Sequence, residues 1–214
     1  MRYFPVHLDL NCLPVLVVGG GVIAERRARA LVDAGAIVRL VSPSCTDGVA
    51  EMAESGIIEY QRREFEANDL DGFAMVIGAT DSKAANKAVA TAARTRALLC
   101  NIVDRPALSN FIVPALVTRG DLQISIATNG RSPSLTQRVK REVAALIGEE
   151  YGELLKLAAD LRTRVHQHTT DYEERRKLLC SFVESDALNL LRSGRRDEAV
   201  ALAEEMLSKF LTKR

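Results

Sequence analysis

Three small residues near the N-terminus have the spacing of a phosphate-binding turn. Gly19, Gly21 and Ala24 match the pattern G-x-G-x-x-G/A. They follow the apolar run 15–18 and lead into a polar, alanine-rich stretch with helical spacing, which is typical of a strand, a tight turn and a helix. A pyrophosphate can approach the N–H groups of such a helix N-terminus only where side chains leave room. The pattern predicts a dinucleotide site, and the alternative is a glycine-rich turn without a cofactor.

A carboxylate at the end of another expected strand is the candidate for proton transfer. Asp104 directly follows the buried run 98–103. In a parallel sheet this position lies at the same edge as the glycine turn, where ligands bind. A carboxylate there can accept a proton from a substrate. The alternative is that Asp104 only caps a turn.

Basic residues cluster later in the chain. Arg138, Lys140 and Arg141 lie on an expected helix over residues 133–147, and Arg131 precedes it. Guanidinium groups bind carboxylates in bidentate fashion, so this helix can anchor a carboxylate-rich substrate. The alternative is a solvated basic face.

The elements that position these residues follow from the apolar pattern. Strands are expected over 13–18, 36–41, 57–60, 73–79 and 98–103, with helices over 25–34, 46–54 and 83–96 between them. Such alternation predicts a parallel, doubly wound sheet whose ligands bind beyond the carboxyl ends of the strands. The residues that we expect to bind the cofactor there are Gly19, Gly21, Val22, Ile23, Ser42, Pro43, Ser44, Ala79, Thr80 and Asp81.

The end of the second expected strand faces the adenine ribose in dinucleotide folds, often with an acidic residue. Here the strand ends in Ser42-Pro43-Ser44, without an acid. The serines can form hydrogen bonds with ribose hydroxyls. The residues themselves leave the choice between NAD and NADP open.

After Pro106 the pattern changes. The runs 111–117 and 122–127 predict an antiparallel hairpin, and residues 149–214 read as helical throughout. A two-stranded ribbon is marginal alone, so we expect it to pair with another subunit.

The bulk composition excludes several classes of protein. The chain has 214 residues, of which 47% are hydrophobic, and its 29 basic and 28 acidic residues give a net charge of +1. Such a small net charge produces no overall electrostatic field that would favour a nucleic acid or a membrane as a partner. Four scattered cysteines, together with the absence of a signal-peptide core and of a long apolar run, predict a cytoplasmic protein. His166 and His168 have the wrong spacing for a metal pair on one helix face, and we expect no metal site.

Several motifs together resemble one family. The segments 18–28, 79–81, 101–104, 110–114 and 126–134 are similar to precorrin-2 dehydrogenase, the N-terminal module of siroheme synthase, and the resemblance covers roughly residues 3–150. Two positions depart from its usual pattern. Arg27 stands where lysine is common, and Arg131 stands where lysine or threonine is common.

The resemblance implies an NAD-dependent oxidation of precorrin-2 to sirohydrochlorin, on the route to siroheme or cobalamin. It places the family's functional aspartate at Asp104 and implies a homodimer formed through the segment after the Rossmann domain. Thr128 aligns with a serine that some members phosphorylate, and nothing in the sequence supports modification here. Some members also insert iron, which the sequence leaves open. For the carboxylates of the tetrapyrrole the candidate partners are Arg105, Arg119, Arg131, Arg138 and Arg141.

The expected fold class is α/β, with an N-terminal Rossmann-type parallel sheet, a small α+β dimerisation segment and an all-helical C-terminal tail. The corresponding domains are 1–112, 113–148 and 149–214. The alternative function is an NAD(H)-sensing regulatory Rossmann module whose helical tail binds a partner protein. Fold alone does not separate the two, and the role of the tail stays open.

Overall fold

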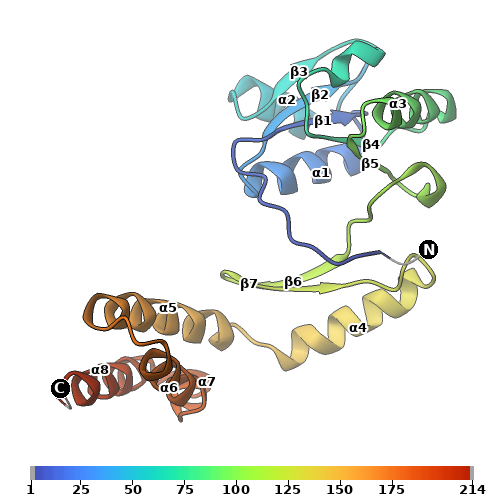
Figure 1. Cartoon of the computed structure of the whole chain (residues 1–214). Helices are drawn as coiled ribbons and strands as arrows, with labels where there is room; N and C mark the ends of the chain where they lie inside the picture. Colours follow the sequence, from blue (N-terminus) through green and yellow to red (C-terminus); the bar gives the residue numbers. More distant parts are fainter. Residues whose placement is uncertain (1–2, 213–214) are drawn as a thin grey trace. The chain divides into compact units, whose positions relative to one another are not determined.

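The structure is a computed structural model that describes residues 3–212 (Figure 1). The first half of the chain forms a five-stranded parallel sheet with helices. The strand order is β3-β2-β1-β4-β5, and every neighbouring pair is parallel. The predicted Rossmann-type sheet is thus confirmed. Its strands are β1 (Pro14–Val18), β2 (Ile37–Val41), β3 (Glu59–Gln61), β4 (Met75–Gly78) and β5 (Leu99–Ile102).

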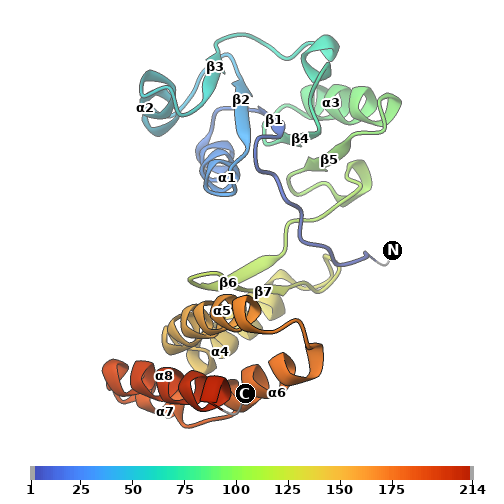
Figure 2. The ribbon, with the colours of Figure 1, turned by 60° about the vertical axis from the view of Figure 1, so that its left-hand side comes forward.

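Helices cover both faces of this sheet. Helices α1 (Val22–Asp33) and α2 (Asp47–Glu54) lie on one side and α3 (Lys83–Thr95) on the other (Figure 2). The side chains of β1 alternate between two hydrophobic cores, Val15 and Val17 packing with α1 and α2 and Leu16 with α3. Burial on both faces explains why the strands are continuous apolar runs rather than alternating ones.

The element boundaries differ from the expected ones at several points. The predicted strand 111–117 begins only at Ala115, because Pro114 has no N–H to donate to a sheet. Helix α1 begins three residues earlier than expected, at Val22. Two short 3-10 helices, Ala67–Leu70 and Pro106–Leu108, were not expected. Residues 3–10 form no strand.

A salt bridge holds the segment that follows β3. Arg63 Nη1 donates to the Asp69 carboxylate at 2.8 Å, and the N–H of Glu66 donates to it at 2.8 Å. The Asp69 side chain is only 8% exposed. The Arg63 guanidinium, helped by the Glu66 N–H, holds the pKa of Asp69 below its usual value. The chain after β3 is therefore fixed by an ionised, largely buried carboxylate.

Asp69→Asn is expected to lower the free energy of unfolding by about 2 kcal/mol at pH 7, the scale of charge-assisted hydrogen bonds. The pKa of Asp69 is lower in the folded than in the unfolded chain. Its stabilisation is therefore present above the unfolded pKa of about 3.9 and is lost as the pH falls through the folded pKa. Urea denaturation at pH 7 and pH 3 should show the difference between variant and wild type shrinking at pH 3.

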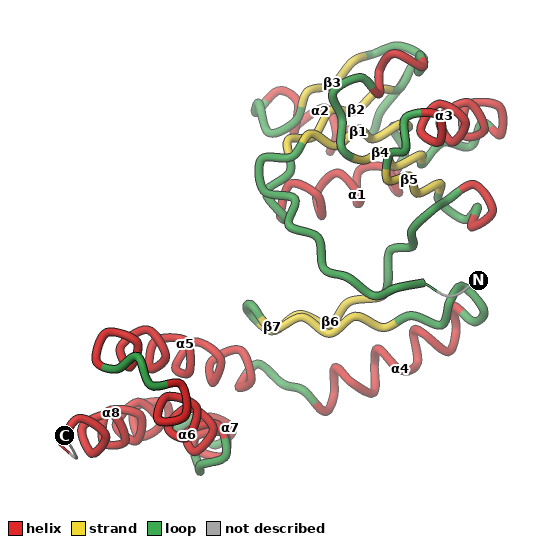
Figure 3. Tube along the Cα trace, viewed as in Figure 1, coloured by secondary structure: helices red, strands yellow, loops and turns green. Residues whose placement is uncertain are grey.

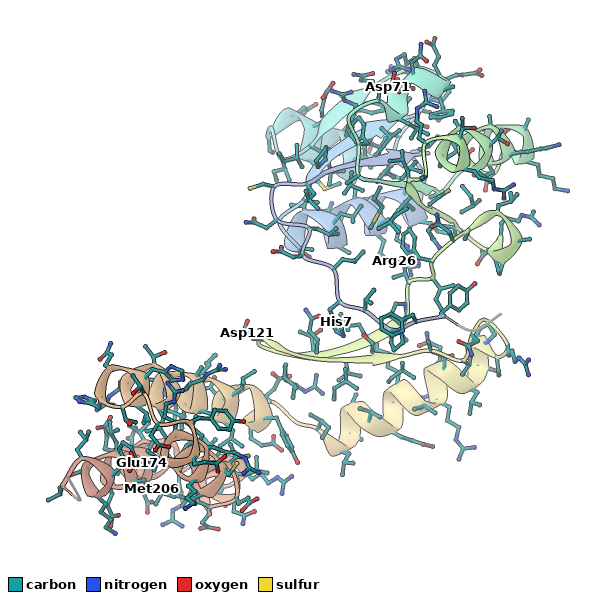
Figure 4. The ribbon with its side chains drawn as sticks, viewed as in Figure 1. His7, Arg26, Asp71, Asp121, Glu174 and Met206 are labelled. Atoms are coloured by element: carbon teal, nitrogen blue, oxygen red, sulfur yellow. The ribbon has the colours of Figure 1, made fainter. Side chains whose placement is uncertain are left out.

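The control for this prediction is Asp71→Asn. Asp71 pairs with Arg96 at 2.9 Å on the surface, and its side chain is 64% exposed (Figure 4). Exposed pairs of this kind contribute about 0–1 kcal/mol. A destabilisation by Asp69→Asn that was equal at both pH values would contradict the assignment to the ionised carboxylate.

A second compact unit begins after Val113. It opens with the antiparallel hairpin of β6 (Ala115–Arg119) and β7 (Leu122–Ile126), which confirms the predicted ribbon. Helix α4 (Pro133–Leu146) packs on this ribbon but has no buried residue of its own. Leu135 and Leu146 on α4 are 49% and 70% exposed.

Four further helices complete this unit (Figure 3). They share a separate hydrophobic core centred on Leu161, Val165 and Phe182. Within residues 3–212 no helix is long and apolar enough to cross a membrane. The helices are α5 (Glu150–His168), α6 (Tyr172–Val183), α7 (Ala187–Arg192) and α8 (Arg196–Thr212).

Candidate functional site

The glycine turn after β1 is pressed against the two neighbouring turns. Gly19 has φ +120°, and a Cβ there would lie 2.2 Å from the carbonyl oxygen of Ala79. A Cβ on Gly20 would lie 1.9 Å from the carbonyl oxygen of Ser44. Both neighbours are backbone atoms, which cannot move away as the end of a flexible side chain could. Only glycine therefore fits at these two positions. The turns after β1, β2 and β4 therefore meet at one edge of the sheet, and Gly20 is a packing position that the sequence analysis missed.

Gly21 has a different environment. Its φ is −81°, and a Cβ there would meet nothing within 4 Å. It is the N-cap of α1, and no side chain caps this helix N-terminus. The first two helical residues, Val22 and Ile23, are 75% and 42% exposed. An open, uncapped helix N-terminus with its positive dipole end fits a pyrophosphate.

The turn after β2 is anchored to the glycine turn through α1. Thr46 donates its N–H to the carbonyl of Gly20 at 2.9 Å and its hydroxyl to Glu25 at 2.7 Å. Glu25 also accepts from Arg29 at 2.8 Å. The Thr46 hydroxyl and then the Arg29 guanidinium hold the pKa of Glu25 below its usual value. Glu25, the acidic residue in the first turn of α1, is thus occupied in positioning the turn.

Residues 42–44 form the rest of that turn. Ser42 is buried, at 8% exposure, and its carbonyl accepts from the Tyr60 hydroxyl at 3.0 Å. The Pro43 carbonyl accepts from Arg62 Nε at 3.3 Å. Tyr60 and Arg62 come from the neighbouring strand β3 and the residues after it, and the sequence analysis had no reason to include them.

The turn after β4 is held by a buried amide. Asn86 on α3 is 6% exposed and donates to the Thr80 carbonyl at 2.7 Å. The Thr80 hydroxyl accepts from the N–H of Ser82 at 3.1 Å, and Ser82 caps α3. The predicted cofactor positions Ala79, Thr80 and Asp81 therefore sit on a rigid turn beside Gly19, with Asp81 exposed.

Asp104 lies on the turn after β5. It has a left-handed backbone, φ +56°, which aspartate and asparagine tolerate better than most residues. The turn is closed by the N–H of Arg105 donating to the carbonyl of Ile102 at 3.0 Å. The Asp104 side chain is exposed and makes no hydrogen bond to any residue in the described part of the chain. The carboxylate does not cap the turn and is open to a substrate.

Two polar residues fix the strand that carries Asp104. Ser109 Oγ accepts from the N–H of Ile102 at 2.9 Å, and Asn110 Oδ1 accepts from the N–H of Cys100 at 2.8 Å. Because β5 is at the edge of the sheet, these side chains satisfy donors that would otherwise lack a neighbouring strand.

Arg27 on α1 is a further charged residue acting on this region. Its Nε is buried and has no hydrogen-bond partner among residues 3–212. Burial, and then the charge of Arg26, lower the pKa of Arg27, while the charge of Asp104 opposes them. In the sequence Arg27 stands out only as a replacement for lysine. Its positive charge attracts the Asp104 carboxylate.

The five predicted substrate arginines differ in their surroundings. Arg105 follows Asp104 and is exposed, and Arg131 and Arg141 are exposed in the second unit. Arg138 is exposed as well and pairs with Glu142 at 2.8 Å. Arg119 is largely buried and donates to the carbonyls of Ile147 and Ala144 at 2.8 and 2.9 Å. Arg119 therefore caps the C-terminus of α4 and has its guanidinium occupied by backbone carbonyls.

Two other residues that the sequence analysis raised have structural partners. Thr128 Oγ1 lies 2.9 Å from Thr136 Oγ1 and accepts from the N–H of Ser132 at 3.2 Å, which ties the turn before α4. His166 Nδ1 lies 3.3 Å from an Arg175 nitrogen. Residues 3–212 contain no group of three His, Cys, Asp or Glu side chains that could hold a metal ion.

Comparisons with protein families cover most of the chain. Residues 6–115 match the family described as putative NAD(P)-binding. Residues 119–146 match the sirohaem biosynthesis protein central region, and residues 150–207 match the sirohaem synthase dimerisation region.

Individual relatives agree with these matches. The chain is 40% identical to a siroheme synthase of Methylococcus capsulatus over 93% of its own length and 42% of the relative. It is 35% identical to siroheme synthase 1 of Aeromonas salmonicida, over 97% of this chain and 45% of that one. It therefore spans less than half the length of these curated relatives. Among solved structures, the precorrin-2 dehydrogenase SirC matches with a TM-score of 0.82 and 27% identity, over 95% of this chain and all of that one.

Proposed function

Because the chain belongs to the family that contains the siroheme synthases and precorrin-2 dehydrogenase, we propose that it oxidises precorrin-2 to sirohydrochlorin with NAD as the electron acceptor. The observation that carries the proposal is the pairing of an open phosphate cradle at Gly21 with an unbonded carboxylate at Asp104. Both lie at the carboxyl end of the same sheet, after β1 and β5, with only β4 between these strands. At the usual strand spacing the two strands are about 10 Å apart, within the reach of an extended dinucleotide.

The reaction removes two hydrogens from the macrocycle. Bound NAD would supply the acceptor for one of them as a hydride, with its electron pair. In the proposal Asp104 takes the other as a proton. The backbone of α1's first turn holds the pyrophosphate, and Ser42, Ser44 and the 79–81 turn flank the rest of the cofactor. Arg105 is the candidate partner for a substrate carboxylate in the first unit, and Arg131, Arg138 and Arg141 are separate candidates in the second unit.

An anaerobic assay tests this function. Purified protein is incubated with enzymatically generated precorrin-2 and NAD, and the absorbance of sirohydrochlorin and of NADH is followed. Formation of both in equal amounts supports the dehydrogenase. If NAD is bound but stays unreduced in the presence of the tetrapyrrole, the NAD(H)-sensing alternative replaces it. Ferrous or cobaltous ion added after oxidation, against an uncatalysed control, decides the open question of metal insertion.

We also propose that the protein works as a homodimer. A family region described by its role in dimerisation matches residues 150–207, whereas the sequence analysis assigned that role to 113–148, and this assignment stays a prediction. The ribbon β6–β7 has only two strands, and α4 leaves Leu146 70% exposed. Tyr172 on α6 is 67% exposed. Both segments thus offer apolar surface to a second copy.

The cytoplasmic location that the sequence predicts stays a prediction.

Light scattering after size-exclusion chromatography is expected to give twice the chain mass of 23.4 kDa. Leu146→Lys and Tyr172→Lys test the two segments separately, because a buried lysine at a dimer interface weakens association. A monomer in only one variant locates the interface in that segment. A monomeric wild type at micromolar concentration would refute the dimer.

A further inference from the structure

The turn after β2 decides which form of the dinucleotide a Rossmann-type site accepts. An acidic residue there binds the ribose 2′-hydroxyl and repels a 2′-phosphate, whereas a nearby arginine accommodates the phosphate. In this chain the turn is Ser42-Pro43-Ser44, and it contains no carboxylate. The chemistry that normally excludes a 2′-phosphate is missing from the turn.

Three carboxylates on neighbouring elements are engaged elsewhere. Glu25 is bound by Thr46 and Arg29, as described above. Glu59 on β3 accepts from Arg39 at 2.7 Å. Asp69 is paired with Arg63. The first acid after the turn is Asp47, which opens α2. Asp47 is therefore an acid that the experiment must test.

A guanidinium lies against the same turn. β3 runs parallel to β2 with Gln61 opposite Val41, so Arg62 leaves the sheet beside Ser42. The N–H of Ser42 donates to the carbonyl of Gln61 at 3.2 Å, which continues this pairing. Arg62 Nε then donates to the Pro43 carbonyl at 3.3 Å. This bond uses one edge of the guanidinium.

The rest of the Arg62 guanidinium is available. Arg62 is exposed, and within residues 3–212 its only hydrogen bond is the one to Pro43. The adjacent Arg63 is different, because Asp69 occupies it. Two terminal nitrogens can bind two oxygens of one phosphate, and such charge-assisted pairs are among the stronger hydrogen bonds in proteins.

We propose that the adenosine end of this site accepts a 2′-phosphate through Arg62, so that the chain binds NADP as well as NAD. The proposal rests on the proposed dinucleotide site and extends it to the phosphorylated form of the cofactor. Arg62 is a specificity-determining residue, and the serines of the turn serve both forms through the remaining ribose hydroxyl.

Binding of cofactor fragments tests this without the tetrapyrrole. Isothermal titration calorimetry compares 5′-AMP, adenosine 2′,5′-bisphosphate and adenosine 3′,5′-bisphosphate. The wild type is expected to bind the 2′,5′-bisphosphate about tenfold more tightly than AMP, the effect of one charge-assisted contact. The 3′,5′ isomer has the same charge and should not share this gain. Arg62→Ala should remove the preference and Arg62→Glu should reverse it, whereas Arg94→Ala, an exposed arginine on α3, should leave it unchanged.

The outcomes separate this inference from the proposed function. A wild type that binds NAD and AMP but binds the 2′,5′-bisphosphate more weakly overturns the inference alone. Equal gains for both bisphosphates, or a preference that survives Arg62→Ala, also overturn it. Asp47, and not Arg62, sets the specificity if two results occur together. The wild type then binds the 2′,5′-bisphosphate more weakly than AMP, and the Asp47→Asn variant binds the two with equal affinity. A protein that binds none of these fragments and no NAD refutes the dinucleotide site itself.

Discussion

Gly21→Asp is expected to weaken NAD binding by about 100-fold or more while leaving the folded protein at least as stable as the wild type. A side chain at this position meets no protein atom within 4 Å, so the fold has room for it. Asp is a good N-cap, and α1 has no side-chain cap now. The added carboxylate would stand where the pyrophosphate must lie. Like charges about 4 Å apart cost roughly 4 kcal/mol at an effective dielectric of 20.

Calorimetric titration with NAD and thermal unfolding of the same preparations measure the two effects. Ser132→Asp is the matched control, since it adds the same charge at another helix N-cap, that of α4, and should leave NAD affinity unchanged. Gly19→Ala is the opposite case. The added Cβ would clash with the Ala79 carbonyl at a residue whose φ is positive. Gly19→Ala should therefore lower the stability of the folded protein, which Gly21→Asp should not do. Unchanged NAD affinity in Gly21→Asp would place the pyrophosphate elsewhere.

Asp104→Asn is expected to lower kcat by about 10²- to 10⁴-fold, the usual contribution of a positioned general base. Asparagine has the same shape and tolerates the positive φ of this position, so the turn should keep its geometry. Asp104→Ala would add backbone strain to the loss of the carboxylate and is the poorer test. The affinity for NAD should change less than about twofold, because general base and cofactor site are separate groups.

Single-turnover formation of sirohydrochlorin under anaerobic conditions measures this loss. The control is Asp121→Asn, which removes an exposed carboxylate at the tip of the β6–β7 hairpin (Figure 4). Retention of more than about half of the wild-type rate in Asp104→Asn would rule out this carboxylate as the base.

The parts of the fold that could be predicted depend on local signals. The strand β1 and the glycine turn are adjacent in sequence, so the apolar run and the glycine spacing suffice to place them. The parallel sheet follows from the alternation of strand and helix, since that connection allows few other arrangements. Ser132 and Pro133 likewise mark the start of α4 by themselves.

The parts that could not be predicted depend on partners far apart in sequence. Arg119 reads as a free basic residue, and only the folded chain shows that it caps carbonyls at Ala144 and Ile147. The same holds for Arg27 and Asp104, which are brought under each other's influence by α1 and the turn after β5. Arg62 lies beside the turn after β2 only because β3 pairs with β2 in the folded chain.

The hydrophobic cores of the two units share no residue. The two cores on either face of the parallel sheet use residues before Val113, and the helical core begins at Leu154. Between them, residues 114–148 contribute only Val117 to the buried apolar side chains. Natural selection can therefore alter either core without repacking the other. Substitutions that change the packing of one core need no matching substitutions in the other. In residues 114–148 the chain's own interior therefore restrains sequence change less than it does in either core.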